Sequence, residues 1–489
     1  MLDQSFSAEN FKEIFHIENR KGNIDRQILS EEYIDLILKI KDLKKELKLY
    51  KAKYKNATID KQHYINVCIE KDKEIDNLKE EKDRVLYEQL KKVSERVNHS
   101  SFKFNFYTNV KRKKTTYELL PNSDNFYAIK QLQYNIRQTF GVKQADRYQI
   151  LKQIKLLLSD NFPKYIIRTD IDSFYESIPQ NKLLKKIETN TLLNYQSKKM
   201  ISSILSEFER LKDEKIGSNI GIPRGVGISA YLCELYMRDI DNKIKALNDV
   251  VYYARYVDDI FIVIVPSKES HNIDKYFQNI QTIIEANDLK LKTKESGKTI
   301  LLDLCKQKSN FEETFTYLGY KITIKDKKET EKKKNDLIQY ISTFGISDDR
   351  IKKYTHRLEI AFKEYSAKSK FNERDARKKL YNCLKFLTGN TNLMSSKKGI
   401  KIGVYYSNSL LEDAEHKDLK KLDGILSKTV NDFLNPYEKL GYNENSLNKF
   451  RQYICQTFSF TEGFRKLKFH DFTIDEFKEL KKLWKDEEA

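Results

Sequence analysis

The chain has 489 residues, enough for about three domains and a substantial hydrophobic core. Its 91 Lys and Arg against 72 Asp and Glu give a formal net charge of +19, which favours polyanions such as nucleic acid as partners. Five dispersed cysteines without a Cys-x-x-Cys pair, and no apolar run near the ~18 residues of a membrane span, argue against a zinc site, a disulfide framework and a membrane partner, so we expect a cytoplasmic protein.

The first hundred residues are predicted to form a separate helical extension, because apolar residues recur there at steps of three and four. One such seam is formed by Tyr33, Leu36, Ile40, Leu43, Leu47, Tyr50 and Tyr54, and a second by Ile75, Leu78, Val85, Leu86, Leu90, Val93 and Val97. Narrow apolar seams are typical of helices that pair. We expect residues 56–60 to separate two helices that fold back as a hairpin, with dimerisation or RNA binding as the alternatives.

Residues 165–170, Tyr-Ile-Ile-Arg-Thr-Asp, predict a short apolar strand that ends at Asp170, with Phe174 and Tyr175 in the turn beyond it. Residues 221–229, Gly-Ile-Pro-Arg-Gly-Val-Gly-Ile-Ser, predict a glycine-rich loop that leads into an apolar helix over residues 230–244. Glycine lets a backbone approach a ligand where any Cβ atom would collide.

The most informative segment is Tyr256-Val257-Asp258-Asp259, at the predicted tip of a hairpin between strands over residues 250–253 and 260–265. Two adjacent ionised carboxylates repel each other, so a fold that presents them together usually holds a cation there. Carboxylate oxygens suit Mg²⁺. A solvated turn is the plain alternative, since Asp favours turns, but the strand ending at Asp170 favours a shared metal site.

Helical periodicity dominates the last third of the chain, after a charged stretch over residues 325–335 that is predicted to be a linker. Amphipathic helices are expected over residues 351–367, 373–387, 410–433, 446–458 and 475–484. Residues 390–393 and 399–407 indicate a loop or a small extended element between them.

Taken in order, these segments resemble the palm of reverse transcriptases. The resemblance includes the strand ending at Asp170, the Gly-x-Pro-x-Gly loop over residues 221–225 and the Tyr-x-Asp-Asp box over residues 256–259. Residues 315–320 look like the family's primer-grip hairpin, and residues 289–299 look like its lysine-bearing motif. The resemblance covers residues 140–325, and the sequences of its motifs look most like those of the bacterial antiphage-defence and abortive-infection reverse transcriptases.

This resemblance implies an α+β right-hand polymerase fold, with fingers and palm over residues 101–330 and a thumb with a helical C-terminal region over residues 331–489. The long helices of residues 1–100 would precede it. The implied activity is RNA-directed DNA synthesis with two Mg²⁺ ions, for which Mn²⁺ is a possible substitute.

Residue roles follow from matching the motifs of the family. The implied catalytic residues are Asp170, Asp258 and Asp259, which would also hold the metal together with Ile171. The implied nucleotide-binding residues are Tyr175, Phe174, Gly225, Arg224, Lys164 and Arg168. Lys294 or Lys298 would protonate the leaving pyrophosphate, and Tyr317, Leu318 and Gly319 would form the primer grip.

Two of these roles have explicit alternatives. A bulky ring at Tyr175 would leave no room for a 2′-hydroxyl and so predicts use of dNTPs, whereas a ring buried in the core would have no such role. Arg224 stands where many relatives carry Gln, and it would either hold a phosphate or form a structural ion pair.

The partners implied by the resemblance are an RNA template, expected to be a structured noncoding RNA, together with dNTPs and a DNA product. A partner reverse transcriptase or a homo-oligomer is also expected, in a role against phage. Two alternatives remain open: a template-independent or protein-primed DNA polymerase of the abortive-infection type, and a catalytically silent RNA-binding scaffold.

Overall fold

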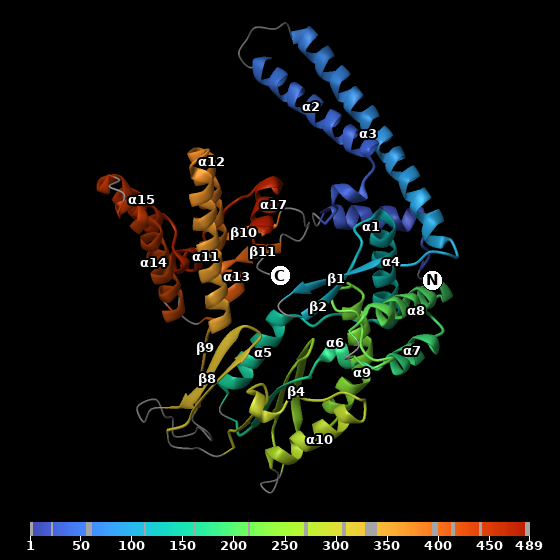
Figure 1. The fold of residues 1–489 in the computed structure, drawn as a ribbon, viewed down its shortest axis with the longest axis vertical. Coiled ribbons are helices and arrows are strands. Elements are labelled where there is room, and N and C mark those ends of the chain that lie inside the picture. The colour runs from blue at the N-terminus through green and yellow to red at the C-terminus, as the bar shows by residue number, and fades with distance from the viewer. Residues whose placement is uncertain are drawn as a thin grey trace. The chain divides into compact units, whose positions relative to one another are not determined.

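Two compact units make up the chain (Figure 1). The computed structural model describes residues 3–20, 23–54, 61–111, 114–160, 162–213, 216–267, 272–305, 310–327, 340–393, 400–411, 416–439 and 443–484. The first unit comprises Met1–Asn109, Thr115–Lys143 and Tyr175–Met237, and the second comprises Val110–Lys114, Gln144–Phe174 and Arg238–Ala489. Most of the predicted linker at 325–335 lies outside the described residues.

The first unit consists mainly of helices. They are α1 (Ala8–Arg20), the short η1 (Arg26–Ile28), α2 (Glu31–Tyr54), α3 (Lys61–Asn98), α4 (Ser123–Phe140), α7 (Gln180–Glu188) and α8 (Tyr195–Leu211). Strands β1 (Phe106–Lys111) and β2 (Lys114–Leu119) pair as a two-stranded sheet. Parts of β1 and β2, and of the short α6 (Phe174–Ser177) and α9 (Ser229–Lys245), belong to the second unit.

The predicted helical hairpin of the N-terminal region is confirmed, because α2 and α3 pack along each other (Figure 1). Ile40, Leu47 and Ile75 form a buried seam between them, with Leu43 and Leu78 beside it. The apolar steps of the two segments thus meet inside one chain. Residues 56–60, predicted as the link, lie outside the described residues.

The second unit contains a four-stranded sheet in the order β4-β5-β3-β6, formed by Val250–Tyr256, Asp259–Ile264, Tyr165–Asp170 and Ile300–Asp303. Each neighbouring pair is antiparallel. All six residues of β3 are buried, as expected for an apolar strand between two neighbours. Helix α5 (Arg147–Ser159) shares a core with this sheet, and α10 (Ile273–Glu285) packs near β6.

A second sheet has the order β7-β8-β9, formed by Glu312–Tyr317, Tyr320–Asp326 and Tyr340–Ile346. Its buried residues Phe315, Tyr317 and Phe344 belong to the same core as α5 and the four-stranded sheet. The primer-grip hairpin suggested by the sequence is β7 and β8, whereas β9 was not predicted.

The C-terminal region is helical, as predicted, and surrounds a core of its own. Its helices are α11 (Asp348–Ser369), α12 (Glu373–Thr388), α13 (Val404–Asn408), α14 (Lys417–Lys439), α15 (Glu444–Thr457), α16 (Phe460–Arg465) and α17 (Ile474–Leu483). Strands β10 (Asn390–Leu393) and β11 (Ile400–Gly403) pair between α12 and α13. Among the described residues, no helix combines the length and the apolar character needed to cross a bilayer.

Two predicted helix starts need correction. The helix expected from Leu410 begins at Lys417 as α14, although Leu410 and Leu411 are buried. The helix expected over residues 230–244 begins one residue earlier, because Ser229 is the first residue of α9, and the Ser229 hydroxyl donates to the carbonyl of Pro223 at 2.6 Å.

Candidate active site

The register of two neighbouring strands brings Asp170 next to the Asp258–Asp259 pair. Strands β3 and β5 are antiparallel, and Asp170 lies directly opposite Asp259. Directly opposed residues of an antiparallel pair have Cβ atoms about 4.5–5.5 Å apart, so their side chains meet on one face. Two carboxylates 89 positions apart in the chain thereby become neighbours.

The turn that carries Asp258 is tight and strained. Strand β4 ends at Tyr256 and β5 begins at Asp259, which leaves only Val257 and Asp258 between them. Val257 has a φ of +60°, a left-handed conformation that is costly for a β-branched residue. The N–H of Ile171 donates to the carbonyl of Asp258 at 3.0 Å, which ties the turn to the end of β3.

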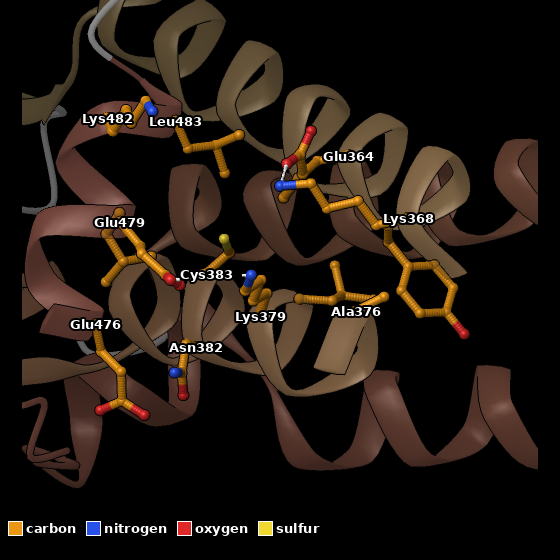
Figure 2. A pocket seen from close by; sticks show the side chains of 14 residues that line it. Glu364, Lys368, Ala376, Lys379, Asn382, Cys383, Glu476, Glu479, Lys482 and Leu483 are labelled. Carbon is orange, nitrogen blue, oxygen red and sulfur yellow. Dashed lines mark ion pairs between the residues drawn. The ribbon is translucent and has the colours of Figure 1, made fainter. Parts of the chain in front are cut away.

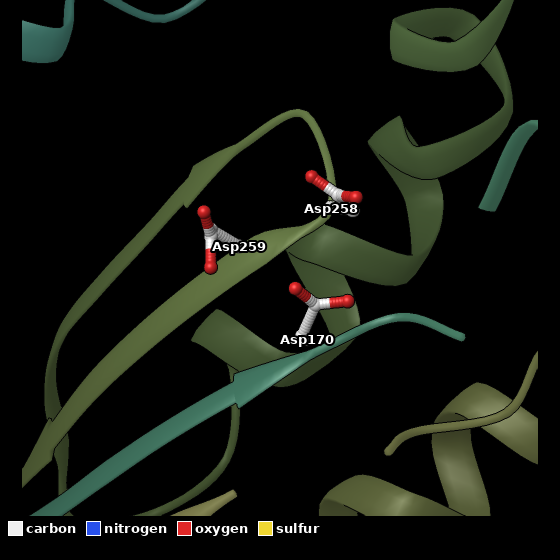
Figure 3. A group of neighbouring side chains, drawn as sticks. All are labelled: Asp170, Asp258 and Asp259. Atoms are coloured by element: carbon white, nitrogen blue, oxygen red, sulfur yellow. The ribbon is translucent and has the colours of Figure 1, made fainter. Parts of the chain in front are cut away.

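Asp170, Asp258 and Asp259 form one acidic cluster, which we call the triad (Figure 3). One carboxylate oxygen from each lies within 4.8 Å of the others. Three hard oxygen ligands at this spacing fit a divalent cation such as Mg²⁺, which would offset the repulsion within this partly buried group of carboxylates. Ile171 contributes a fully buried side chain, so only its backbone could reach a cation at this site.

The electrostatics of the triad show the cost of assembling these charges. Burial, followed by the neighbouring charge of Asp258, raises the pKa of Asp170 above its usual range. Burial also raises the pKa of Asp259 to about 6, against the opposing effect of Arg168. Both shifts indicate that the ionised carboxylates lack enough positive charge nearby, which a bound cation would supply.

Arg168 supplies part of the missing charge. Its guanidinium forms an ion pair with Asp259 at 3.0 Å and also donates to the carbonyl of Lys298. The side chain is almost fully buried beneath the triad. Arg168 therefore holds Asp259, whereas the sequence had suggested a triphosphate contact.

Lys292 is a functional candidate that the sequence analysis missed. Residues 290–292 run beside the end of β3: the N–H of Lys292 donates to the carbonyl of Asp170 at 2.9 Å, and that of Asp172 donates to the carbonyl of Lys290 at 2.8 Å. This register brings the amine of Lys292 to 3.8 Å from the carboxylate of Asp170. The only sequence signal was the position of Lys292 in the lysine-bearing segment.

The two lysines predicted as leaving-group acids have different surroundings. The amine of Lys294 pairs with Asp274 at 2.8 Å on an exposed surface. Lys298 is near enough for its charge to oppose the raised pKa of both Asp170 and Asp259. The geometry therefore favours Lys292 and Lys298 over Lys294 as amines beside the triad.

Lys164 does not join the triad. It precedes β3, at the end opposite Asp170, and five strand steps of ~3.3 Å separate Tyr165 from Asp170, about 17 Å in all. Its buried amine pairs with Asp160 and also donates to backbone carbonyls. This geometry does not support the predicted nucleotide contact of Lys164.

The ring of Phe174 is also removed from any ligand, since it is buried to 1% exposure. Tyr175 begins a different unit, and its side chain is half-buried, so it is not enclosed in a core. The Arg224 guanidinium stacks 4.8 Å from the centre of the Tyr175 ring. It also forms a two-pronged ion pair with Glu176, at 2.9 and 3.0 Å. The structural ion pair considered for Arg224 is thus present, and it borders Tyr175.

The glycine-rich loop is held against the same segment. The N–H of Ile222 donates to the carbonyl of Tyr175, and the N–H of Tyr117 donates to that of Arg224 at 2.7 Å. Gly225 has a φ of +102°, and a Cβ there would lie 2.9 Å from the carbonyl oxygen of Tyr117. Gly225 is therefore required for the loop to approach β2, whatever it binds.

The predicted primer-grip residues form the tight turn between β7 and β8. Leu318 and Gly319 both have positive φ, at 45° and 77°, as the favoured two-residue hairpin turn requires. Tyr317 is fully buried, and its hydroxyl lies 3.5 Å from the backbone oxygen of Asp259. The turn is therefore connected to the triad through one side chain.

A separate cavity of about 410 Å³ lies among α11, α12 and α17 (Figure 2). Its floor is apolar, with Leu380, Leu480 and the buried thiol of Cys383. Charged residues at its rim pair with each other, as Lys368 does with Glu364 and Lys379 with Glu479 at 3.9 Å. Among the described residues that line the cavity, no acidic cluster comparable to the triad is found, so we do not place the chemistry there.

Comparison with known proteins supports the assignment of the triad region. Residues 82–322 match the family model described as "Reverse transcriptase (RNA-dependent DNA polymerase)", which includes the whole triad. No curated protein sequence matches the chain.

Among solved structures, the chain is similar to telomerase from Candida albicans with a TWJ fragment of telomeric RNA, at 10% identity and a TM-score of 0.35, over 73% of this chain and 64% of that one. It is also similar to apo telomerase from Candida tropicalis, at 13% identity and a TM-score of 0.34, over 79% of this chain and 66% of that one. The chain thus spans less than two thirds of each telomerase.

Proposed function

We propose that this chain joins dNTPs into DNA on an RNA template with two Mg²⁺ ions held by Asp170, Asp258 and Asp259. Residues 82–322 match the reverse transcriptase family model, which indicates an RNA-directed DNA polymerase, a nucleotidyltransferase. The observation that supports this most directly is the convergence of the three carboxylates within 4.8 Å. We include in this proposal a right-hand polymerase arrangement of fingers, palm and thumb.

Each residue of the site has a task in this reaction. Divalent cations held by the triad would neutralise charge on the attacking 3′ oxygen and on the departing pyrophosphate. Arg168 keeps the Asp259 carboxylate in place through its ion pair. The Lys292 amine, 3.8 Å from Asp170, carries a proton that can pass to the leaving group.

Use of deoxynucleotides is proposed from Tyr175. A ring held beside the incoming sugar leaves no space for a 2′-hydroxyl. The contacts of Arg224 with the ring and with Glu176 restrict the movement of Tyr175. Replacing Tyr175 by Ala should increase incorporation of ribonucleotides relative to deoxynucleotides, and an unchanged ratio would remove this role.

Sequencing of the products tests templated synthesis. The purified protein is supplied with a defined RNA, a DNA primer, the four dNTPs and Mg²⁺, and the products are sequenced. We expect DNA complementary to the RNA, and we expect no product from a protein with Asp258→Asn and Asp259→Asn that still binds RNA. Products unrelated to the RNA would instead indicate template-independent or protein-primed synthesis, and equal synthesis by the double variant would refute the site.

A role in bacterial antiphage defence, with a structured noncoding RNA as template and a second reverse transcriptase or a second copy as partner, rests on the resemblance of the motifs alone. Phage plating on cells that express the chain tests the role. Protection that disappears in the Asp258→Asn variant is expected, and equal plating with and without the chain would refute it. RNA copurified from these cells would identify the template.

A further inference from the structure

The turn between β7 and β8 is enclosed by two arginines that come from distant parts of the chain. Arg147 is the first residue of α5, and Arg350 lies in the first turn of α11. A Cβ placed on Gly319 would lie 2.9 Å from a terminal nitrogen of Arg147 and 2.8 Å from the Cδ of Arg350. Two arginine side chains that are 203 positions apart along the chain therefore converge on one glycine.

Both arginines contact only neutral groups of this turn and its surroundings. Arg147 donates to the carbonyl of Leu318 through two nitrogens, one of them at 2.9 Å. Arg350 donates to the carbonyls of Gly319 at 3.4 Å and Ser407 at 2.9 Å. Both guanidiniums also lie over the ring of Tyr320, at 6.0 and 5.6 Å from its centre. These hydrogen bonds use two of the five N–H donors of each guanidinium.

The two positive charges are not balanced by acidic side chains. Within the described part of the chain, no carboxylate lies within 4.0 Å of either guanidinium. Asp146, directly before Arg147, accepts the N–H groups of its own helix, and Asp348 lies 3.9 Å from Lys321. Asp349, directly before Arg350, is exposed and forms no ion pair with its guanidinium within 4.0 Å. Burial, followed by the charge of Arg350, lowers the pKa of Arg147 below its usual range. Such a pair is costly unless an anion joins it.

The position of the pair indicates which anion. Tyr317, the residue before the turn, reaches the backbone of Asp259 in the triad with its hydroxyl at 3.5 Å. A nucleic-acid strand whose end lies at the triad would therefore carry its nearest phosphates past this turn. Arginine forks match the geometry of phosphate oxygens.

We propose that Arg147 and Arg350 form a phosphate-binding site that holds the backbone of the strand being extended, close to its 3′ end. This inference rests on the proposed function, because it takes the triad to be the place of DNA synthesis. The hydrogen bonds to Leu318 and Gly319 set the arginines against the turn, so the turn and the phosphate are positioned together. The pair acts in binding and positioning the strand.

Salt dependence of binding distinguishes a phosphate contact from a structural role. Each phosphate neutralised by the protein releases counterions, so the slope of log affinity against log salt falls by about one when one phosphate contact is lost. We would measure this slope for a fluorescent hybrid of an RNA template with a DNA primer, in the absence of dNTPs. The proteins are the full-length chain and variants Arg147→Gln with Arg350→Gln, Arg350→Gln alone, and Arg147→Lys with Arg350→Lys.

We expect the glutamine variants to lose about one unit of slope and the lysine variant, which keeps the charge, to retain the slope of the wild type. Arg465→Gln is the matched control, because Arg465 already pairs with Glu462 and its loss should leave the slope unchanged. Circular dichroism verifies that each variant is folded.

Several results would overturn the proposal. If the arginines only hold the turn, the glutamine variants bind more weakly at every salt concentration with an unchanged slope. An equal loss of slope on single-stranded RNA alone would place the contact on the template. These outcomes leave the proposed function intact, because the wild type still binds the hybrid and extends the primer. If the wild type does not bind the hybrid at all, both the proposed function and this site are refuted.

Discussion

Replacing Asp170 with Asn should stabilise the protein in the absence of divalent cations and at the same time abolish DNA synthesis. Asp170 is buried, and the burial and the charge of Asp258 both raise its pKa. In cation-free buffer at neutral pH, the folded protein must therefore hold an ionised carboxylate in a place that disfavours it. Asparagine has nearly the same shape and no charge.

The size of the effect follows from the spacing of the triad. Two unit charges at the 4.8 Å limit of its oxygens interact by about 3 kcal/mol at an effective dielectric constant of ~20. Loss of the 3.8 Å contact between Lys292 and Asp170 subtracts part of this gain. We expect the free energy of unfolding to increase by about 1–2 kcal/mol, which corresponds to a rise in melting temperature of about 1–2 °C for a chain of this length.

Thermal denaturation in EDTA and in MgCl₂ measures the effect, and hydrogen exchange of the β3 amides shows whether it is local. Mg²⁺ should stabilise the wild type, because an ion that binds only the folded state adds free energy with its concentration. It should stabilise Asp170→Asn much less. Asp172→Asn is the matched control, because Asp172 is exposed and only two residues away. A variant at position 170 that is less stable than the wild type in EDTA, or equally stabilised by Mg²⁺, would contradict the role given to the triad.

Three further outcomes are expected. Arg224→Ala removes contacts at 2.9, 3.0 and 4.8 Å that are together worth about 1–2 kcal/mol, so Tyr175 should move more freely. Incorporation of ribonucleotides relative to deoxynucleotides should then increase up to about tenfold, and Glu176→Gln should have a weaker effect of the same kind. Single-nucleotide competition assays measure both ratios, and unchanged ratios would disprove the coupling. Lys292→Ala should lower kcat about 10²-fold or more with little change in primer–template affinity, measured by single-turnover extension; a change in affinity alone would argue for a binding role. Because the pKa of Asp259 is raised from 3.8 to about 6, its contribution to folding stability without cations is lost as pH rises through about 4 to 6. Below about pH 6, protons should compete with Mg²⁺ for this carboxylate, so the Mg²⁺ affinity measured by calorimetry should be weaker at pH 5.5 than at pH 7.5. Equal affinities at the two pH values would contradict this.

Much of the candidate site could be predicted from local sequence. The alternation and β-branched residues around 256–259 predicted the hairpin, and the apolar residues before Asp170 predicted β3. The N-terminal seams predicted two helices, and their pairing followed from the need to cover both seams. Such patterns depend on neighbours a few residues apart, which is why a single sequence reveals them.

Other features could not be predicted correctly, because an apolar pattern shows that a residue is buried but not which element or core buries it. Leu410 and Leu411 continued an apolar pattern into α14, yet they lie before the helix and are buried in two different cores. Strand β9 follows a charged stretch and joins its sheet only through β8. The buried ring of Phe174 and the pairing of Lys164 with Asp160 likewise depend on packing rather than on residue type.

The sequence by itself determined the residue types of the proposed chemistry: the three carboxylates, the turn that presents two of them, and a basic chain suited to nucleic acid. Only the tertiary structure decided which cations stand beside them, because that depends on the register of segments far apart in the chain. The pairing of residues 290–292 with 170–172 selects Lys292, and the meeting of α5 with α11 at Gly319 joins Arg147 to Arg350. Register and packing are set by the burial of whole faces, which no short motif specifies.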